Sequence, residues 1–384
     1  MDKPNSSWIS QGAKSLCGGL VGLGFLLLPS LAAASPPFLP PMVSAFVFST
    51  IPSNGDLNPY GVAFVPPGFP GGNLNPGDVL VSNFNNSLNQ QGTGTTILRV
   101  QLTPQAPNPQ TSTFADTSTL MPPVIGLTDA LGAISQGFVF VGSVFTNKGD
   151  VTSVARGPLV VLDDSGAEAD RIPASDLNGP WGLAINSRDP SKVQVFVSNV
   201  FDGTISRIDF SFPAPGKIEH SNITQIASGY SHKLDSMAVV IGPAGLVYDQ
   251  SEDILYVAGE DDDKIFAVSN ASTTTDQGTG RVIFADPNRL HGPMGLSFAP
   301  NGNLIVANND SINPDKNQPS ELVEFTIRGK FVREISIDPN LDGPFGIAFA
   351  QFNGLDELPF VNDNNNTLTV WNFQQRRADD MGNQ

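Results

Sequence analysis

Short apolar runs, separated by proline, glycine and asparagine, recur along most of the chain. Five of them open on a Pro-x-Gly turn: Asn58–Phe64, Gly179–Ile185, Gly242–Tyr248, Gly292–Phe298 and Gly343–Phe349. A second type of run contains a shared valine, at positions 81, 141, 197, 257, 306 and 361. These valines are 60, 56, 60, 49 and 55 residues apart. A phrase that returns at a nearly fixed interval indicates one supersecondary unit copied along the chain.

The composition of these runs predicts β-strands. They are short, rich in β-branched and aromatic residues, and bounded by Gly, Pro, Asn and Asp. A third run completes most units, as in Thr204–Ile208, and a weaker fourth run follows, as in Val282–Phe284. The unit around Val141 has no clear Pro-x-Gly turn, and we expect Asp129–Ile134 to be its opening strand. No window outside the N-terminal segment shows a sustained helical period.

Four strands in each of about six units predict an all-β fold, a six-bladed β-propeller of four-stranded antiparallel blades. A solenoid would also produce a repeat, but its period is usually shorter. Only a polar tail follows Trp371, so the last blade lacks an outer strand. Ser44–Ser49 precedes the first turn and can supply it. The ring is then closed by an N-terminal strand, which removes a free sheet edge.

The paired phrases, Gly-Pro-x-Gly-apolar and then apolar-Val-Ala/Ser-Asn/Asp, resemble those of the NHL-repeat propellers. That superfamily includes gluconolactonase-like metal hydrolases, streptogramin lyases and plain binding modules. The resemblance covers most of residues 44–373 and implies a propeller that binds its ligands on one face near the axis. Gluconolactonase-like enzymes open their first blade with Glu-Gly-Pro, whereas this chain has Leu57-Asn58-Pro59 there.

Charge and cysteine content narrow the range of functions. Asp and Glu total 37 against 20 Lys and Arg, which gives a formal charge of −17. A nucleic acid is a poor partner for such a surface, because its phosphates are also negative. The single cysteine, Cys17, lies near the N-terminus, so residues 35–384 contain no candidate for a disulfide or a thiolate site.

The N-terminal segment has the order of a secretory signal peptide. Lys3 and Lys14 flank a polar start, Leu16–Leu28 is an apolar core, and Ala32–Ala34 offers a small-residue cleavage site. We therefore expect residues 1–34 to be a signal peptide and residues 35–384 to be one propeller domain. An uncleaved membrane anchor is the alternative. No later apolar stretch is long enough to span a bilayer.

Polar residues next to the repeated phrases are the candidate site. Those that precede the turns are Asn58, Asn178, His291 and Asp342, and those that follow the shared valines are Asn83, Asn199, Asn308 and Asp363, with Glu260 one residue further on. In an enzyme, Asn199, Asn308 and Asp363 would hold Ca²⁺, which prefers carbonyl and carboxylate oxygens and can polarise an ester or lactone carbonyl. His291 or Asp342 would move protons, and Asn83, Asn178 and Glu260 would bind substrate. Two alternatives stay open: a polar substrate site without a metal, and residues that only stabilise their own tight turns.

Three insertions are expected to wall a cup on the ligand face, because all lie between second and third strands: Asn85–Thr95, Thr146–Gly157 and Asn309–Ser320. The sequence thus predicts an exported, secreted or periplasmic, NHL-like propeller. We expect a ligand- or protein-binding module, a monomer with a small molecule or a protein partner on the axial face. The alternative is a calcium-dependent hydrolase, lactonase or lyase that acts on a small polar substrate.

Overall fold

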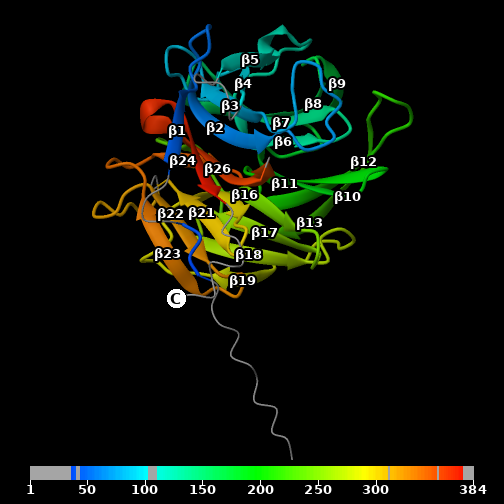
Figure 1. Cartoon of the computed structure of the whole chain (residues 1–384). Helices are drawn as coiled ribbons and strands as arrows, with labels where there is room; N and C mark the ends of the chain where they lie inside the picture. The colour runs from blue at the N-terminus through cyan, green and yellow to red at the C-terminus, as the bar shows by residue number, and fades with distance from the viewer. Residues whose placement is uncertain (1–35, 40–43, 103–109, 310–311, 353, 375–384) are drawn as a thin grey trace, which may run out of the picture. The chain divides into compact units, whose positions relative to one another are not determined.

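The computed structural model describes residues 36–39, 44–102, 110–309, 312–352 and 354–374. Contacts within the chain group Pro36–Gln384 into one compact unit, a six-bladed β-propeller (Figure 1). The predicted signal peptide lies outside the described residues. No helix among the described residues is long and apolar enough to cross a membrane.

Each of the first five blades is an antiparallel sheet of four strands in chain order from the axis outward, and the sixth takes its outer strand from the N-terminal side. The first blade consists of β2 (Leu57–Phe64), β3 (Val79–Asn85), β4 (Thr96–Val100) and β5 (Thr111–Asp116). The second consists of β6 (Leu127–Ile134), β7 (Phe138–Asn147), β8 (Asp150–Asp163) and β9 (Glu168–Ile172). The third consists of β10 (Pro180–Asp189), β11 (Lys192–Asn199), β12 (Thr204–Ser211) and β13 (Glu219–Ser228). A separate hairpin, β14 (Lys233–Asp235) and β15 (Val239–Ile241), links the third blade to the fourth.

The remaining blades repeat the arrangement. The fourth blade consists of β16 (Pro243–Asp249), β17 (Ile254–Gly259), β18 (Lys264–Ser269) and β19 (Arg281–Phe284), and the fifth of β20 (Pro293–Phe298), β21 (Leu304–Asn308), β22 (Glu321–Phe325) and β23 (Phe331–Ser336). The sixth consists of β24 (Pro344–Ile347), β26 (Leu355–Asn362), β27 (Thr367–Gln374) and β1 (Ser44–Ser49), with a short β25 (Ala350–Phe352) beside β26. Two short 3₁₀ helices, η1 (Thr117–Thr119) and η2 (Asp363–Asn365), complete the described elements.

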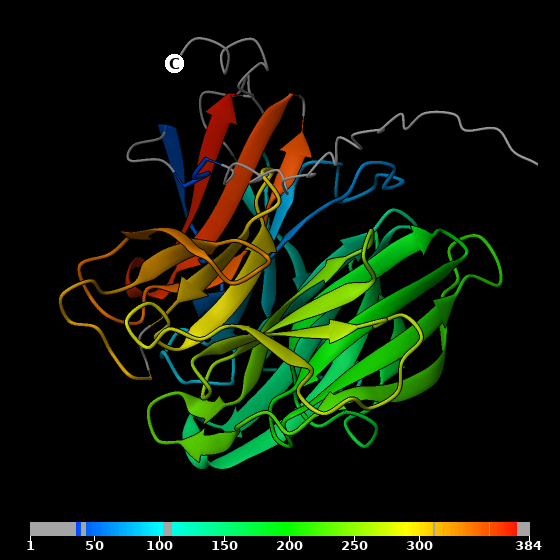
Figure 2. The ribbon, with the colours of Figure 1, turned by 90° about the horizontal axis from the view of Figure 1, so that it is seen from below.

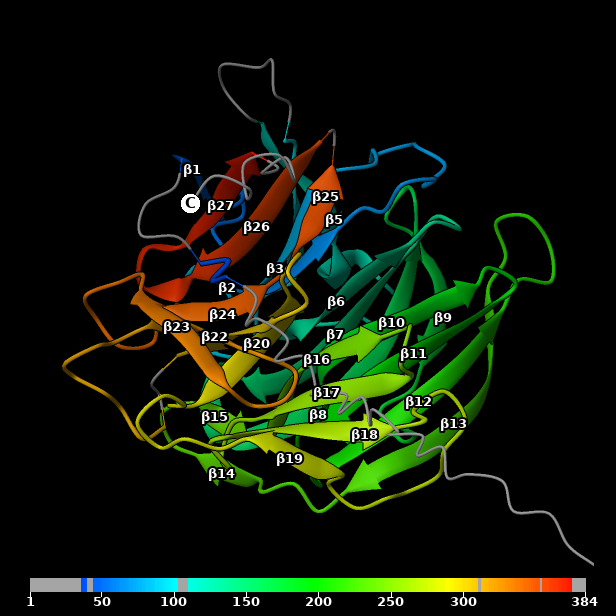
Figure 3. The same ribbon diagram turned by 60° about the horizontal axis from the view of Figure 1, so that its bottom comes forward.

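The expected closure of the ring by the N-terminal strand is confirmed. β1 pairs with β27 in regular antiparallel register from Ser44 opposite Asn372 to Ser49 opposite Thr367. The two strands lie side by side, blue against red, in Figure 2 and under their labels in Figure 3. The last blade therefore combines both ends of the propeller domain.

The segment before β1 is anchored to the fifth blade. The buried carboxylate of Glu324 accepts hydrogen bonds from the backbone N–H groups of Phe38 and Leu39, at 2.8–3.0 Å. Leu39 is fully buried among residues of the fifth and sixth blades.

The six inner strands form a closed ring, because each contacts the inner strands of two neighbouring blades. The repeated glycines make this possible. A Cβ on Gly182, Gly245, Gly295 or Gly346 would lie only 2.1–2.3 Å from the carbonyl oxygen of the residue after the proline in the next blade. The Pro-x-Gly glycines are therefore required by close backbone approach between blades.

The second blade departs from the repeat by one extra residue. In its inner strand, three residues separate Leu127, which pairs with the end of the second strand, from the next paired residue, Leu131. In the other blades only two residues separate the paired proline from the next paired residue. The strand begins at Leu127 rather than at the expected Asp129. Asp129 thus lies inside a bulge, and this explains why no Pro-x-Gly turn is visible there.

Candidate functional site

The register of the blades defines the end of the ring at which polar residues gather. At this end, called the axial face below, each inner strand begins and each second strand ends. Pro59 pairs with Asn83, Pro180 with Asn199, and Pro293 with Asn308. These asparagines therefore occupy equivalent positions in three blades.

The alignment of the sixth blade with the others, as expected from the sequence, is wrong by one residue. In the sixth blade Pro344 pairs with Asn362, and Ile347 pairs with Phe360. The equivalent of the shared valine is thus Phe360 rather than Val361, and Asp363 lies one position beyond the asparagines. A shift of one residue places a side chain on the opposite face of a strand, so the difference matters. The true equivalents of Asp363 are Phe84, Val144, Val200, Glu260 and Asn309.

The three equivalent asparagines brace the turn that follows them. Each amide Nδ2 reaches the first residue of the third strand of its own blade: Asn83 to Thr96 at 3.2 Å, Asn199 to Thr204 at 3.0 Å, and Asn308 to Glu321 at 3.3 Å. Oδ1 of Asn199 accepts from the backbone N–H of Asn178 at 3.1 Å. Oδ1 of Asn83 and of Asn308 is buried and has no hydrogen-bond partner among the described residues.

Burial and carboxylates from several blades raise the pKa of Tyr60, which lies near the start of the first inner strand. The pKa of Tyr60 is raised well above its usual value by burial and then by Asp363, Glu260, Asp342 and Asp129. Three of these are residues singled out in the sequence. Asp129 was not, because its position near the axis depends on the bulge, which has no sequence signature.

Burial raises the pKa of three of these carboxyl groups, those of Asp129, Glu260 and Asp363. It raises the pKa of Asp129 to about 7, and burial with the neighbouring Asp342 raises that of Asp363 to about 7. Burial also raises the pKa of Glu260 far above its ordinary value, although hydrogen bonds from Gly242 and the Asn309 side chain oppose the shift. Oε2 of Glu260 has no hydrogen-bond partner among the described residues. Near pH 7 this face thus contains groups that can either donate or accept a proton.

His291 lies at the fifth blade, with one nitrogen fixed and the other unpartnered. Its Nδ1 is 2.6 Å from the backbone oxygen of Asn313, so Nδ1 carries the proton in the neutral ring. Nε2 is then a hydrogen-bond acceptor, and it is buried without a partner in the described part of the chain. Asp342 is exposed, and its backbone N–H donates to the carbonyl of Asn309 at 2.6 Å. Asn178, in contrast, is bound by Arg156 and Asp202 through its side chain.

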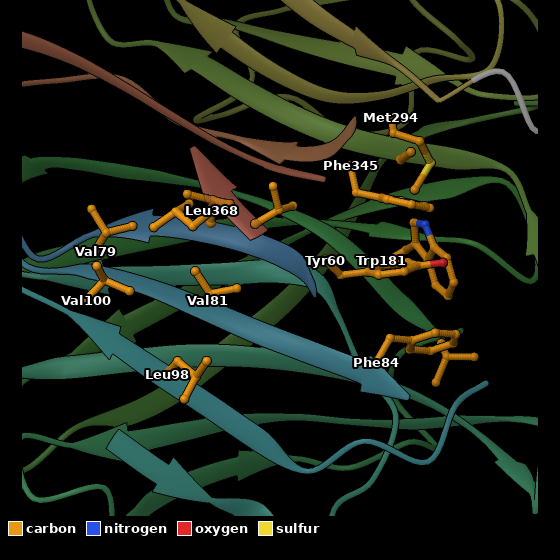
Figure 4. Close-up of a cluster of buried hydrophobic side chains, with 14 of the residues drawn as sticks. Tyr60, Val79, Val81, Phe84, Leu98, Val100, Trp181, Met294, Phe345 and Leu368 are labelled. Atoms are coloured by element: carbon orange, nitrogen blue, oxygen red, sulfur yellow. The ribbon is translucent and has the colours of Figure 1, made fainter. Parts of the chain in front are cut away.

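Aromatic side chains from the inner strands of several blades pack together in one buried cluster (Figure 4). The ring of Tyr60 stacks on Phe345 at 4.3 Å between centroids and meets the edge of Trp181 at 5.8 Å. Phe84 packs against both Tyr60 and Trp181. Val239 and Val240 of the β14–β15 hairpin belong to the same apolar cluster. Side chains from the first, third, fifth and sixth blades thus meet in one apolar cluster.

A polar pocket of about 380 Å³ lies on this face, between the first and sixth blades and the loops that rise around them. Its lining is rich in amides and contains one cation and one anion: Asn58, Asn85, Asn89, Gln90, Gln91, Lys148, Gly149, Val151, Ser236, Met237 and Asp363. Oδ1 of Asn58 and Oδ1 of Asn85 are buried and have no partner among the described residues.

Three segments wall the pocket. The insertion Asn85–Thr95 supplies four of the lining side chains, and the tip of the β7–β8 hairpin supplies Lys148. The second insertion is thus an extension of two strands rather than an irregular loop. The β14–β15 hairpin, which the sequence did not reveal, is joined to the first insertion by a hydrogen bond of 2.9 Å from Gln91 Nε2 to the carbonyl of Met237.

The described residues contain no group of three or more His, Cys, Asp or Glu side chains placed to hold a metal ion. Of the expected calcium ligands, only Asp363 lines the pocket. Asn199 belongs to the third blade and Asn308 to the fifth, and both stabilise turns in their own blades.

Among the comparisons with known proteins, the similarity to one solved structure, a gluconolactonase, supports the fold. No protein-family model matches the chain, and no curated protein is similar to it in sequence. Among solved structures, a gluconolactonase from Xanthomonas campestris is similar with a TM-score of 0.53 and 11% identity, over 86% of this chain and 90% of that one. The PQQ-bound aldose sugar dehydrogenase from Streptomyces coelicolor gives 0.47 and 16%, over 87% and 100%. A luciferin-regenerating enzyme gives 0.49 and 11%, over 87% and 96%.

Proposed function

We propose that this protein is an exported, NHL-like propeller whose axial pocket binds a small, strongly polar ligand. The observation that carries the proposal is the pocket itself. Its walls come from an insertion, an extended hairpin and an interblade hairpin, and closing the six-bladed ring requires none of them. Long segments on a rigid scaffold commonly serve recognition.

The lining indicates the chemistry of the ligand. Most small-molecule pockets are largely apolar, and a volume of about 300–1,000 Å³ is typical. This pocket falls at the small end of that range, and five of its eleven lining residues have amide side chains. Amides both donate and accept hydrogen bonds, so they suit a ligand with many hydroxyl or amide groups. Lys148 adds a positive charge, and Asp363 adds a carboxyl group that is partly ionised near pH 7, because its pKa is raised to about 7.

Thermal shift with a panel of sugars, sugar acids and amino acids tests the proposal. A compound that binds only the folded state raises the melting temperature. At a concentration one hundred times its Kd, it adds about 2.7 kcal/mol to the free energy of unfolding. Asn58→Gly removes a lining side chain at a position where φ is +59°, a conformation that glycine adopts readily. Asn270→Gly is the matched control, since φ is +52° there and the residue is exposed outside the pocket. The proposal fails if no compound shifts the melting temperature, or if both variants respond equally.

A hydrolase or lyase is the second candidate, and two observations favour it. Asp363 has a pKa of about 7 within the pocket, and His291 presents an unpartnered Nε2 on the same face. In this version Asp363 would contribute to a Ca²⁺ site, and His291 or Asp342 would move protons. Calcium should then raise the melting temperature of the wild type, and Asp363→Asn should remove most of that effect. Asp249→Asn, at the far end of the fourth inner strand, should not. A melting temperature indifferent to millimolar calcium and to chelator would reject the metal.

A further inference from the structure

The outer strands of five blades carry two features that discourage pairing with other chains. Each contains at least one residue with an ionisable side chain: Asp116 in β5; Glu168, Asp170 and Arg171 in β9; Glu219 and His220 in β13; Arg281 in β19; and Arg333 and Glu334 in β23. Each also has an irregularity in its register with the third strand. Charges and bulges are the usual means by which proteins protect sheet edges.

β1, the outer strand of the sixth blade, has neither feature. Its sequence, Ser-Ala-Phe-Val-Phe-Ser, contains no charged residue, and its six pairs with β27 run without a register shift. Phe46 is 47% exposed and Val47 is 62% exposed, on opposite faces of the strand. With Ile51 they make up three of the nine large hydrophobic side chains that are exposed in the described part of the chain. β1 ends the strand order of its sheet, on the rim of the propeller (Figure 3).

We propose that β1 is a dimerisation edge, and that it pairs antiparallel with β1 of a second copy of this chain. A two-fold axis perpendicular to the sheet, at Phe46 or Val47, would join two sixth blades into one continuous sheet. Such an interface is self-complementary: Phe46 and Val47 lie near the axis, and serines lie at both ends. No like charges would face one another across the new strand pair.

Electrostatics favours this edge over the other five. Two copies with a formal charge of −17 each repel one another, and an uncharged strand on the rim is where close approach costs least. Screening at physiological salt acts beyond about 8 Å, so the repulsion falls as salt is added. The dimer should therefore strengthen with salt, unlike one that is held by ion pairs.

The interface is small. Stable dimers usually bury about 1,200–2,000 Å² in total, and a six-residue strand with a few flanking side chains buries less. Association should therefore depend on concentration in the micromolar range. This differs from the monomer expected from the sequence, because the sequence places Ser44–Ser49 as an outer strand but does not show that the other outer strands carry register irregularities that this one lacks.

Sedimentation velocity of the purified full chain, from about 1 to 200 μM, tests the proposal, since weak interfaces populate both states over such a range. The wild type should shift from monomer to dimer, and more so at high salt. Val47→Lys should weaken the dimer at least tenfold, because two added lysines would lie close across the axis. Val282→Lys is the matched control, since Val282 is also on an outer strand, β19, and is 44% exposed.

The sedimentation results of the β1 variants and of the control either support or overturn the β1 dimer. Melting curves establish that the variants fold, and Ala45→Lys, at another exposed position of β1, replaces Val47→Lys if that variant does not. A wild type that stays monomeric throughout the range overturns the proposal. So does a dimer that persists in the β1 variants, because association would then arise from another surface, such as the apolar N-terminal segment. Equal weakening by Val282→Lys also overturns it.

Discussion

Gly295 offers the sharpest test of how the blades are packed. A Cβ at this position would lie 2.3 Å from the carbonyl oxygen of Phe345 in the next inner strand, and 2.9 Å from a side-chain carbon of Ile347. Even a crowded Cβ contact is at least 3.0 Å, so Gly295→Ala must move the fifth and sixth inner strands apart by about 0.7 Å. The obstacle is backbone within a closed ring, so no flexible side chain can yield.

Overpacking of a core typically costs 1–3 kcal/mol, and we expect Gly295→Ala to reach the top of that range, about 3 kcal/mol. Gly216→Ala is the control. Gly216 has φ of +68°, and an added Cβ would meet no heavy atom within 4 Å, so the cost there is backbone strain alone, about 1 kcal/mol. Urea unfolding of both variants measures the difference. A Gly295→Ala protein within about 1 kcal/mol of the wild type would refute the close-approach argument.

Three further predictions follow from other features. The pKa of Asp129 is raised to about 7 in the folded protein, so the folded state holds an extra proton and stability falls as pH rises from about 4 to about 7. Asp129→Asn should therefore melt higher than the wild type at pH 8 but not at pH 4, and a difference independent of pH would contradict this. Deletion of residues 36–50 removes β1 and the partners of Glu324, so it should lower the melting temperature of the whole ring; a soluble truncation as stable as the parent would contradict the role of this segment. N-terminal sequencing of exported protein should begin near Ser35, whereas intact Met1 in a membrane fraction would indicate an uncleaved anchor.

Much of the fold was predictable because each repeated motif marks a strand whose turn or packing needs those residue types. A Pro-x-Gly turn marks the start of an inner strand, and the runs around Val81 and Val197 mark second strands. The closing strand was predictable from what the last blade lacked. The serines of the Val-Ser-Asn phrase also have a local reason: Ser198 accepts from the N–H of Gly182 and donates to the carbonyl of Ala244 in the next blade, each at 2.8 Å.

The candidate site was less predictable, because it depends on register and on insertions that follow no repeat. The sequence pattern aligns Asp363 with Asn199 and Asn308, although pairing places it one position later. Asp129 reaches the axis only because of an extra residue in its strand. Met237 reaches the pocket on a hairpin whose short strands have no distinctive sequence pattern. Such features depend on contacts between distant parts of the chain, and local patterns do not contain that information.

The closure of the sixth blade has a consequence for the order of events during synthesis. β1 is made first among the strands, and its partner β27 is made last, more than 300 residues later. At about 5–20 residues per second, β1 waits roughly 15–65 seconds before its partner exists. Throughout that interval an uncharged, aromatic strand has no native neighbour. The emergence of β27, rather than that of any earlier strand, is therefore the moment at which the ring can first close. The first strand must therefore stay unpaired until β27 is available.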